Sequence, residues 1–401
     1  MDTALCYDTA ALKTLSDELR AELTGNILPF WQNRMVDPAG GFYGRIDGNG
    51  NLHADAGRGI IMYARILWAF SAAFNLLRDG SYLATAKRAF DCMAEHFHDK
   101  EYGGMYWMIA PDGKPVETKK QIYAQGFAIY GLSEYYRASG DSEALRQALE
   151  LVELVEKHAW DATSGGYIEA CTRDWRPNDD MRLSAKESNV PKSMNTHLHI
   201  IEPYTNLYRI HPTPELRERI KRLTGIFRNH IFNETTGHFD LLFYHDWTPA
   251  GHEFSYGHEI EASWLLDEAA TAIGEDCGEI VQRVADSATE GLQPDGSMAY
   301  EYDPISDELD AERHWWVEAE AMVGFFNLYQ RTAEKHYLNT VLRLWEYIKA
   351  NLIDRTGGEW FWGVKPDSSV NRESDKAGFW KCPYHNTRLC TELITRIKEL
   401  Q

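Results

Sequence analysis

The stretch DKEYGGMYWM, residues 99–108, is the clearest copy of a pattern that recurs six times and decides the fold. Most copies open on an acidic or amide residue, continue through a short turn with glycine, and end in aromatic or apolar residues. The other five copies begin at Asp37, Asp161, Asn233, Leu292 and Asp354. Glycine supplies the positive φ that a tight turn requires, and the residues after it favour short strands. Six copies spaced about 60 residues apart, with one longer interval, indicate an array or a closed ring.

The segments between the copies have the periodicity of helices. Apolar residues recur at three and four positions in 59–77, 121–136 and 317–330. Each interval holds two helices, of which the first is the more apolar and the second, as in 142–160 or 214–232, is more charged. In a ring of helix pairs the apolar members form the inner layer and the charged members form the outer layer.

The helices expected from this pattern number about twelve. The inner helices begin near residues 57, 119, 195, 255, 313 and 385, and the outer helices begin near residues 9, 80, 142, 214, 278 and 335. We expect the segment 9–35 to close the ring by packing on the helix at 385–400, with short β-hairpins at one end. Residues 1–401 would then form a single all-α domain. An open α-solenoid is the alternative, but the inner helices lack the polar concave face of a solenoid.

Composition and charge narrow the possible partners. The chain has 401 residues and a formal net charge of −20, which disfavours nucleic acid, anionic membranes and polyanionic substrates. The six cysteines are scattered without metal or redox spacing, so a reducing compartment is expected. The start of the chain lacks a signal-peptide pattern, and no apolar run reaches the length of a membrane span. We therefore expect a cytoplasmic protein with a small neutral substrate, as a monomer or weak dimer.

Polar residues gather where the inner helices begin. These residues are Arg65, Tyr123, Asn195, His199, His258, Glu261, Trp316, Glu320 and His385. Residues three or four apart face the same way on a helix, so three pairs can each present two groups to one cavity: Asn195 with His199, His258 with Glu261, and Trp316 with Glu320. A closed ring would bring all these turns to one mouth, and a site built from every inner helix is expected there.

Several other interpretations compete for these residues. HEIE at 258–261 could be half of a di-iron motif, but the second Glu-x-x-His that such a centre needs is missing, so no metal is expected. His197 and His199 diverge by roughly 200° on a helix, which favours His199 in the cavity and His197 in the packing. Trp316 and Trp380 could be core aromatics. Arg65 lies in an apolar segment and needs a partner or a ligand. No P-loop, dinucleotide or GxSxG motif is present.

Taken together, two histidines, carboxylates, an arginine and aromatic rings form an acid/base site for a neutral polyol. At these residues the sequence resembles the N-acylglucosamine 2-epimerase superfamily, and within it the cellobiose 2-epimerases. The matching segments are 63–73, 119–136, 194–210, 256–266, 313–330 and 380–390. The resemblance implies an (α/α)6 barrel and a cofactor-free isomerase that inverts C2 of a reducing-end glucose or mannose unit in cellobiose- or lactose-type disaccharides.

The resemblance also implies roles for individual residues. His258 and His385 take the acid/base positions, with His385 also assisting ring opening. The implied sugar ligands at the reducing end are Arg65, Tyr123, Asn195, His199 and Glu261. Trp316, Trp380 and Glu320 look like the groups that hold the second sugar, and Trp264 falls at a further family position beside His258.

The chemistry of C2 inversion explains this choice of residues. The C2 proton lies next to the C1 carbonyl of the open sugar, and its removal leaves an enediolate that a guanidinium such as Arg65 can stabilise. Histidine serves as base or acid near neutral pH, and one histidine on each face would invert the carbon. The alternatives are a mannose 2-epimerase, an aldose–ketose isomerase, a glycoside hydrolase using Glu261 and Glu320, and a non-catalytic binding toroid.

Overall fold

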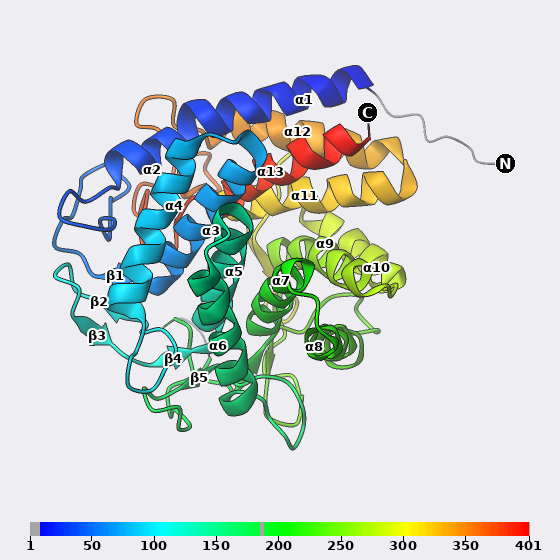
Figure 1. The fold of residues 1–401 in the computed structure, drawn as a ribbon. Helices are drawn as coiled ribbons and strands as arrows, with labels where there is room; N and C mark the ends of the chain where they lie inside the picture. Colours follow the sequence, from blue (N-terminus) through cyan, green and yellow to red (C-terminus); the bar gives the residue numbers. More distant parts are fainter. Residues whose placement is uncertain (1–8, 185–187, 401) are drawn as a thin grey trace.

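The computed structural model describes residues 9–184 and 188–400 and consists of two concentric layers of helices (Figure 1). The inner helices are α3 (Ile60–Leu77), α5 (Ile122–Ser139), α7 (Met194–Ile210), α9 (Tyr256–Ile273), α11 (Trp315–Thr332) and α13 (Tyr384–Glu399). The outer helices are α1 (Thr9–Glu22), α2 (Leu28–Arg34), α4 (Gly80–Cys92), α6 (Ser142–His158), α8 (Pro214–Ile226), α10 (Gly278–Ala288) and α12 (Lys335–Asn351). Four outer helices continue into a short turn of another helix type. These are π-helical turns at Leu23–Ile27, Met93–Phe97 and Phe227–Ile231, and a 3₁₀ turn at Thr289–Gly291. The predicted helix starts are confirmed to within three residues.

The inner helices form a closed ring. Each packs on the next in sequence order, and the last, α13, packs on the first, α3. Helix α1 lies against α13, as expected of the segment that completes the outer layer. The open solenoid is therefore wrong, and the (α/α)6 barrel is confirmed.

The sequence of each layer explains its place. Helix α3 is long and apolar enough to cross a membrane by composition alone, but most of it is buried as an inner helix of the barrel. Helix α6 is amphipathic: its buried residues include Ala144, Leu151 and Val155, which return to one face every three or four positions. The side chain of Asp141 caps α6 by accepting the Glu143 N–H at 3.0 Å.

Each of the six repeated turns contains a glycine in the left-handed region. Their glycines all have positive φ, at 63° for Gly41, 75° for Gly104, 82° for Gly166, 81° for Gly237, 94° for Gly296 and 77° for Gly358. A single antiparallel bridge closes each turn, as between His98 and Met105. The conformation predicted from the repeat is therefore confirmed in all six copies.

The fourth residue of an inner helix anchors the turn beside it. The Met105 N–H donates to Oε1 of Gln125 at 2.8 Å, and the Met298 N–H donates to Oε1 of Glu318 at 3.0 Å. The Tyr167 N–H donates to Nε2 of His197 at 2.9 Å. The expected packing role of His197 is thus confirmed, because its ring binds a backbone turn.

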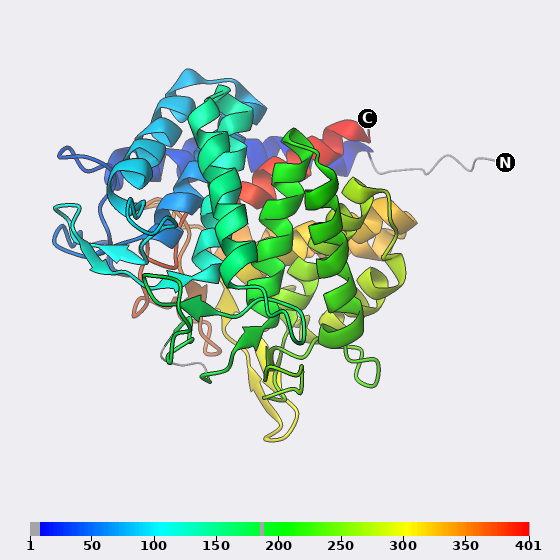
Figure 2. The ribbon, with the colours of Figure 1, turned by 60° about the horizontal axis from the view of Figure 1, so that its bottom comes forward.

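The described residues include twelve short strands, which lie at the same end of the barrel as these turns (Figure 2). They are β1 (Arg58–Gly59), β2 (Met108–Ile109), β3 (Pro115–Glu117), β4 (Lys120–Gln121), β5 (Ala170–Cys171), β6 (Lys192–Ser193), β7 (Leu242–Phe243), β8 (Phe254–Ser255), β9 (Glu301–Asp303), β10 (Glu308–Asp310), β11 (Arg313–His314) and β12 (Gly363–Val364). Their antiparallel sheets are β1-β2-β3, β4-β5, β6-β7, β8-β9-β10 and β11-β12.

Strand pairing differs from the hairpins that were expected. Most pairs join the residues before one inner helix to the residues after the following turn, so that Gly59 pairs with Met108 and Ser193 with Leu242. A bridge between Ile46 and Ala377 makes the sixth such link, and it joins the first repeat to the last. Among the named strands of the described residues, β2-β3 and β9-β10 are the pairs that form local hairpins. The strands therefore tie each repeat to the next.

Buried ion pairs explain why an acidic residue opens the repeat. Nζ of Lys120, just before α5, lies 3.0 Å from Oδ2 of Asp99, and both side chains are fully buried. Lys192 before α7 pairs in the same way with Asp161 at 3.0 Å. Each pair clamps a turn to the start of an inner helix, where breaking it would leave a charge unpaired.

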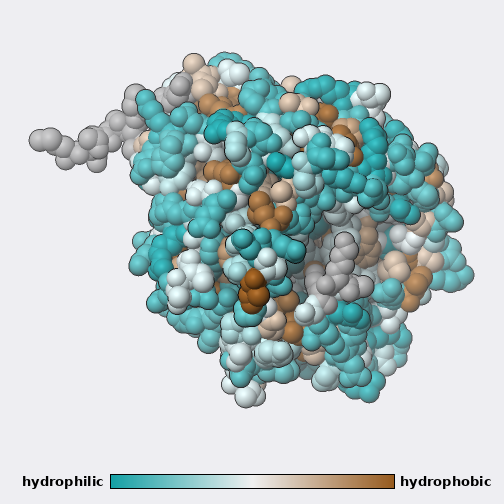
Figure 3. Space-filling view, turned by 180° about the vertical axis from the view of Figure 1, so that it is seen from behind, coloured by the Kyte–Doolittle hydropathy of each residue, from teal (hydrophilic) through white to brown (hydrophobic). Residues whose placement is uncertain are grey.

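The surface seen from behind is mostly hydrophilic, and its apolar residues are scattered (Figure 3). The large apolar side chains that are most exposed lie apart at the strand-bearing end: Val116 on β3, and Ile305 and Tyr244 in two loops. The free cysteines among the described residues are all buried, and Cys6 lies outside the described residues.

Candidate active site

Most of the expected site residues lie in the first two turns of the inner helices, at the end where the strands gather; Trp264 is the ninth residue of α9, and Trp380 precedes α13. The second residue of four of these helices is Tyr123, Asn195, Trp316 or His385, and His258 is the third residue of α9. The sixth residue of four of them is Arg65, His199, Glu261 or Glu320. The helix N-termini, with their partial positive charge, therefore surround these side chains.

Exposure divides the set into two levels. Asn195, His258, Trp316 and Trp380 are partly exposed and form an outer level. The remaining members are at most 5% exposed and form a buried floor: Arg65, Tyr123, His199, Glu261, Trp264, Glu320 and His385.

The two predicted acid/base histidines lie against the same indole. The ring centroid of Trp316 is 4.8 Å from that of His258 and 5.7 Å from that of His385. Nδ1 of His258 is 2.9 Å from Oγ of Ser255, and Nδ1 of His385 is 2.8 Å from Oε1 of Glu320. Among the described residues neither Nε2 has a hydrogen-bond partner, so Nε2 is the atom each ring can offer to a substrate.

The site histidines are neutral at neutral pH. Burial, followed by the nearby His199, lowers the pKa of His258 to about 3. Burial also lowers the pKa of His199 to about 3, and burial with the guanidinium charges of Arg65 and Arg388 holds the pKa of His385 well below its ordinary value. Neutral imidazole is the form that a general base requires.

Arg65 is a buried cation without an ion-pair partner among the described residues. One of its terminal nitrogens donates to the Tyr123 hydroxyl at 2.7 Å, and its guanidinium lies over Phe127 at 4.1 Å from the ring centroid. Its Nε has no hydrogen-bond partner in the described structure, and neither has the buried Oδ1 of Asn195. Buried polar groups without partners are rare in proteins, so both atoms indicate a polar ligand at this site.

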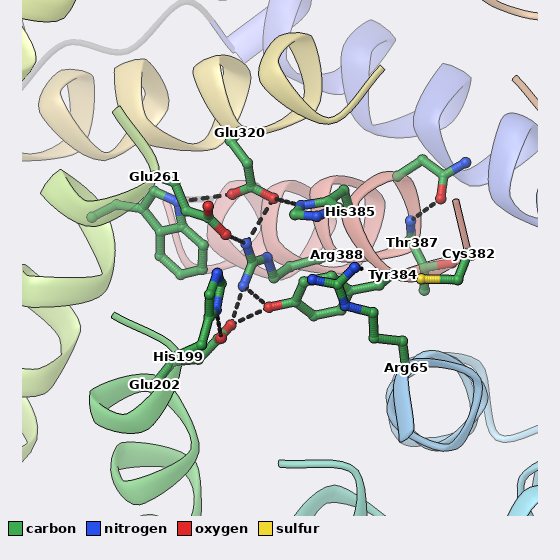
Figure 4. A network of polar contacts seen from close by, with 12 residues as sticks. Arg65, His199, Glu202, Glu261, Glu320, Cys382, Tyr384, His385, Thr387 and Arg388 are labelled. Carbon is green, nitrogen blue, oxygen red and sulfur yellow. Dashed lines mark hydrogen bonds and ion pairs between the residues drawn. The ribbon is translucent and has the colours of Figure 1, made fainter. Parts of the chain in front are cut away.

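A second arginine, Arg388, lies at the centre of the buried side chains of the site, and it is not among the residues predicted from the sequence. Arg388 is fully buried and contacts the carboxylates of Glu202 and Glu261, the Glu320 carboxylate at 2.7 Å, and the Tyr384 hydroxyl (Figure 4). Oε2 of Glu202 also lies 2.9 Å from Nδ1 of His199. The arginine is therefore linked through one carboxylate each to His199 and His385.

The sequence does carry a signal for this network, in the regular spacing of histidines and charged residues. A charged residue follows each site histidine by three positions, as Glu202 after His199, Glu261 after His258 and Arg388 after His385. Such pairs share a helix face. In HEIE at 258–261 this spacing predicted that His258 and Glu261 share one cavity.

Three residues of the predicted set, Glu261, Glu320 and Trp264, are almost fully buried and contact other buried side chains of the site. Glu261 pairs with Arg388, while His258 is held by Ser255 instead. Glu320 is fully buried, and the Trp264 N–H donates to its Oε2 at 3.2 Å. The contacts of Glu320 in this structure favour support of His385, and its predicted contact with a second sugar stays a prediction.

The carboxylates of Glu261 and Glu320 are paired with a cation of the protein itself, the Arg388 guanidinium. One ligand atom each of Glu261, Glu320 and His385 lie within 4.8 Å of one another, a spacing that could suit a metal ion. The guanidinium of Arg388 contacts both carboxylates, however, and it supplies the positive charge that a metal would bring. The donor set is therefore that of an ion-pair network.

Comparison with known proteins agrees with this fold. The N-acylglucosamine 2-epimerase family model matches residues 41–388. A cellobiose 2-epimerase from Bacteroides fragilis is 48% identical over 95% of this chain and 98% of its own length, and one from Ruminococcus albus is 40% identical over 94% and 98%. The solved structure of cellobiose 2-epimerase from Bacillus thermoamylovorans superposes with a TM-score of 0.93 at 40% identity, over 96% of this chain and 100% of the other. The chain belongs to the N-acylglucosamine 2-epimerase family.

Proposed function

We propose that the protein interconverts the glucose and mannose configurations at C2 of the reducing-end unit of β-1,4-linked disaccharides such as cellobiose. Family membership makes the chain a sugar 2-epimerase and therefore an isomerase. The observation that carries the proposal is the pair of neutral imidazoles of His258 and His385, each held at Nδ1 with Nε2 free, against one indole beside the unpaired Arg65.

The reaction begins with opening of the sugar ring, which exposes the C1 carbonyl. One histidine removes the C2 proton through Nε2, and the other delivers a proton to the opposite face of the planar enediolate. The roles reverse with the direction of reaction. Arg65 is placed to stabilise the enediolate oxygens, because its buried charge has no carboxylate partner among the described residues.

A disaccharide substrate is supported by the partly exposed tryptophans and by the relatives. Trp316 and Trp380 can each present an indole to the apolar face of a second sugar. The two curated relatives and the solved structure described above are all named cellobiose 2-epimerases.

The hydrolase alternative has little support from the geometry. Glu261 and Glu320, the two carboxylates that would form a hydrolytic dyad, are at most 1% exposed and are both engaged by Arg388. We further propose that the reaction needs no cofactor, because imidazoles and guanidinium suffice for proton transfer and charge stabilisation. The free cysteines and the net charge of −20 support a cytoplasmic protein that acts without nucleic acid or membrane, as a monomer or weak dimer.

The test is incubation with cellobiose, lactose, mannose and N-acetylmannosamine in D₂O, with the products followed by NMR. We expect inversion at C2 of the reducing-end unit of the disaccharides, with deuterium incorporated at that carbon. Retention of the original C2 proton in the inverted product, release of free glucose, or loss of activity with a chelator would contradict the proposal. Preference for mannose would correct the substrate alone.

A further inference from the structure

The two acid/base histidines are supported by groups of different chemistry. The partner of His258 Nδ1 is the Ser255 hydroxyl, which cannot take up a proton near neutral pH. The partner of His385 Nδ1 is a carboxyl oxygen of Glu320, which can. The second contact is therefore a route along which a proton can move.

A positive charge on His385 would be costly where this ring lies. The ring is 5% exposed, and the permanent charges of Arg65 and Arg388 both act on it. An imidazolium would add a further cation to this buried group. When Nε2 takes a proton from C2, release of the Nδ1 proton keeps the ring neutral and avoids the free-energy cost of a buried imidazolium.

Glu320 is suited to receive that proton. The side chain is fully buried on α11, and the carboxylates of Glu202 and Glu261 share Arg388 with it. One guanidinium thus faces three carboxylates, which favours the neutral form of one of them. Burial is the main cause that raises the pKa of Glu320 to about 8, while Arg388 lowers it and Glu261 raises it.

We propose that Glu320 is the proton store of His385, so that the pair takes up and delivers protons without the ring becoming a cation. When His385 is the base, the C2–H bond breaks and its proton binds Nε2. The Nδ1 proton moves to Oε1 of Glu320, and the sugar keeps the electron pair as enediolate. When His385 is the donor, Nε2–H protonates C2 and the Glu320 proton returns to Nδ1. Between turnovers, His258 and the pair exchange protons with water.

The inference rests on the proposed function, and it predicts an asymmetry between the two epimers. Glu320→Gln keeps the shape of the side chain and can still accept the Nδ1–H of His385, but the amide cannot take up the proton. Abstraction by His258 does not need Glu320. The variant should therefore still exchange C2–H in the epimer that His258 deprotonates and return the isotope to the same face.

The experiment follows C2–H loss and inversion separately in D₂O, starting from each of the two epimers. For Glu320→Gln we expect exchange without inversion from one epimer at close to the wild-type rate. From the other epimer, exchange and inversion should both slow by roughly 10²-fold or more. Glu318→Gln, a buried carboxylate two residues away that anchors a turn instead of the site, is the matched control for stability. It should affect both epimers equally.

Equal slowing of exchange from both epimers by Glu320→Gln, or no slowing from either, would overturn the proposal. Absence of C2 exchange in the wild-type enzyme would instead overturn the proposed function. If Glu320→Gln does not fold, the wild type gives the answer. Loss of C2–H to solvent should show a normal solvent isotope effect from the epimer deprotonated by His385, and none from the other. Equal effects from both epimers would contradict the proton store.

Discussion

Oγ of Ser255 lies 2.9 Å from Nδ1 of His258, and Ser255 immediately precedes α9, on which His258 is the third residue. The serine is fully buried, so this contact fixes the orientation of the ring. We expect Ser255→Ala to reduce kcat by about fivefold, the equivalent of one hydrogen bond of about 1 kcal/mol, with little change in KM. Steady-state kinetics on cellobiose check this. Ser255→Thr, which keeps the hydroxyl, should retain more activity than the alanine variant.

Removal of either acid/base histidine should abolish most of the activity. His258→Ala and His385→Ala are each expected to lower kcat by about 10²- to 10⁴-fold, the usual contribution of general acid–base catalysis. His197→Ala is the contrasting variant, because His197 binds the Tyr167 N–H and takes no part in proton transfer. It should lower the melting temperature while the folded fraction keeps its kcat. A mild effect of either site variant would remove that histidine from the acid/base pair.

The acid limb of the pH profile should lie well below the ordinary range of histidine. Because burial lowers the pKa of His258 and of His199 to about 3, these rings stay neutral as the pH falls from 8 to about 5. Protonation, which would remove the base, therefore occurs only at lower pH. We expect kcat/KM to show no decrease with a midpoint near 6.5. Circular dichroism at each pH separates loss of activity from unfolding. A midpoint at 6.5 would show that the rings are solvated in the working enzyme.

The turn glycines should tolerate substitution according to the space around them. Gly104 has a φ of 75°, and a Cβ there would lie 2.5 Å from the Trp175 ring. Gly140 ends α5 with a similar φ of 72°, but a Cβ there meets nothing within 4 Å. Gly140→Ala should cost about 1 kcal/mol, from φ alone. Gly104→Ala should cost roughly 3 kcal/mol, because the clash adds to the strain. Urea denaturation measures both, and equal costs would contradict the argument.

Arg388 should be the most sensitive position of the floor. Arg388→Met leaves the carboxylates of Glu202, Glu261 and Glu320 buried around an apolar side chain, and removing one partner of a buried ion pair typically costs about 3–5 kcal/mol. We expect a fall of at least that size in the free energy of unfolding. Arg137→Met is the control, because its side chain is 52% exposed although its partner Glu134 is also buried. A comparable loss in both variants would argue against the special position of Arg388.

The sequence was sufficient for the fold because the helix signals are local and repeated. The outer helices begin at Thr9, Gly80, Ser142, Pro214, Gly278 and Lys335, all as predicted. Turn glycines, capping residues such as Asp141, and apolar periodicity all act within a few residues. The pairing of Gly59 with Met108 was not predictable in the same way, because two-residue strands carry no periodicity and their partners are set by how the repeats pack.

The site was predictable where a residue is unusual for its surroundings. Arg65 in an apolar helix is such a case, and the structure gives it no carboxylate partner among the described residues. Arg388 lies in a helix with several polar residues, where a charge is unremarkable. Only closure of the ring brings it to Glu202, 186 positions away in the sequence. Its importance is a property of the assembled barrel, which local sequence patterns do not report.

The bridge between Ile46 and Ala377 has a consequence for how the enzyme folds during synthesis. An open array of repeats can fold from either end and can gain or lose a unit, since each unit needs only its neighbours. Here the bridge joins the first repeat to the last. His385 lies on α13, the helix that closes the ring by packing on α3. During synthesis the last histidine therefore arrives together with the last interface. Five repeats would give neither a sealed barrel nor a complete pair of histidines, so catalytic competence appears in one step with closure.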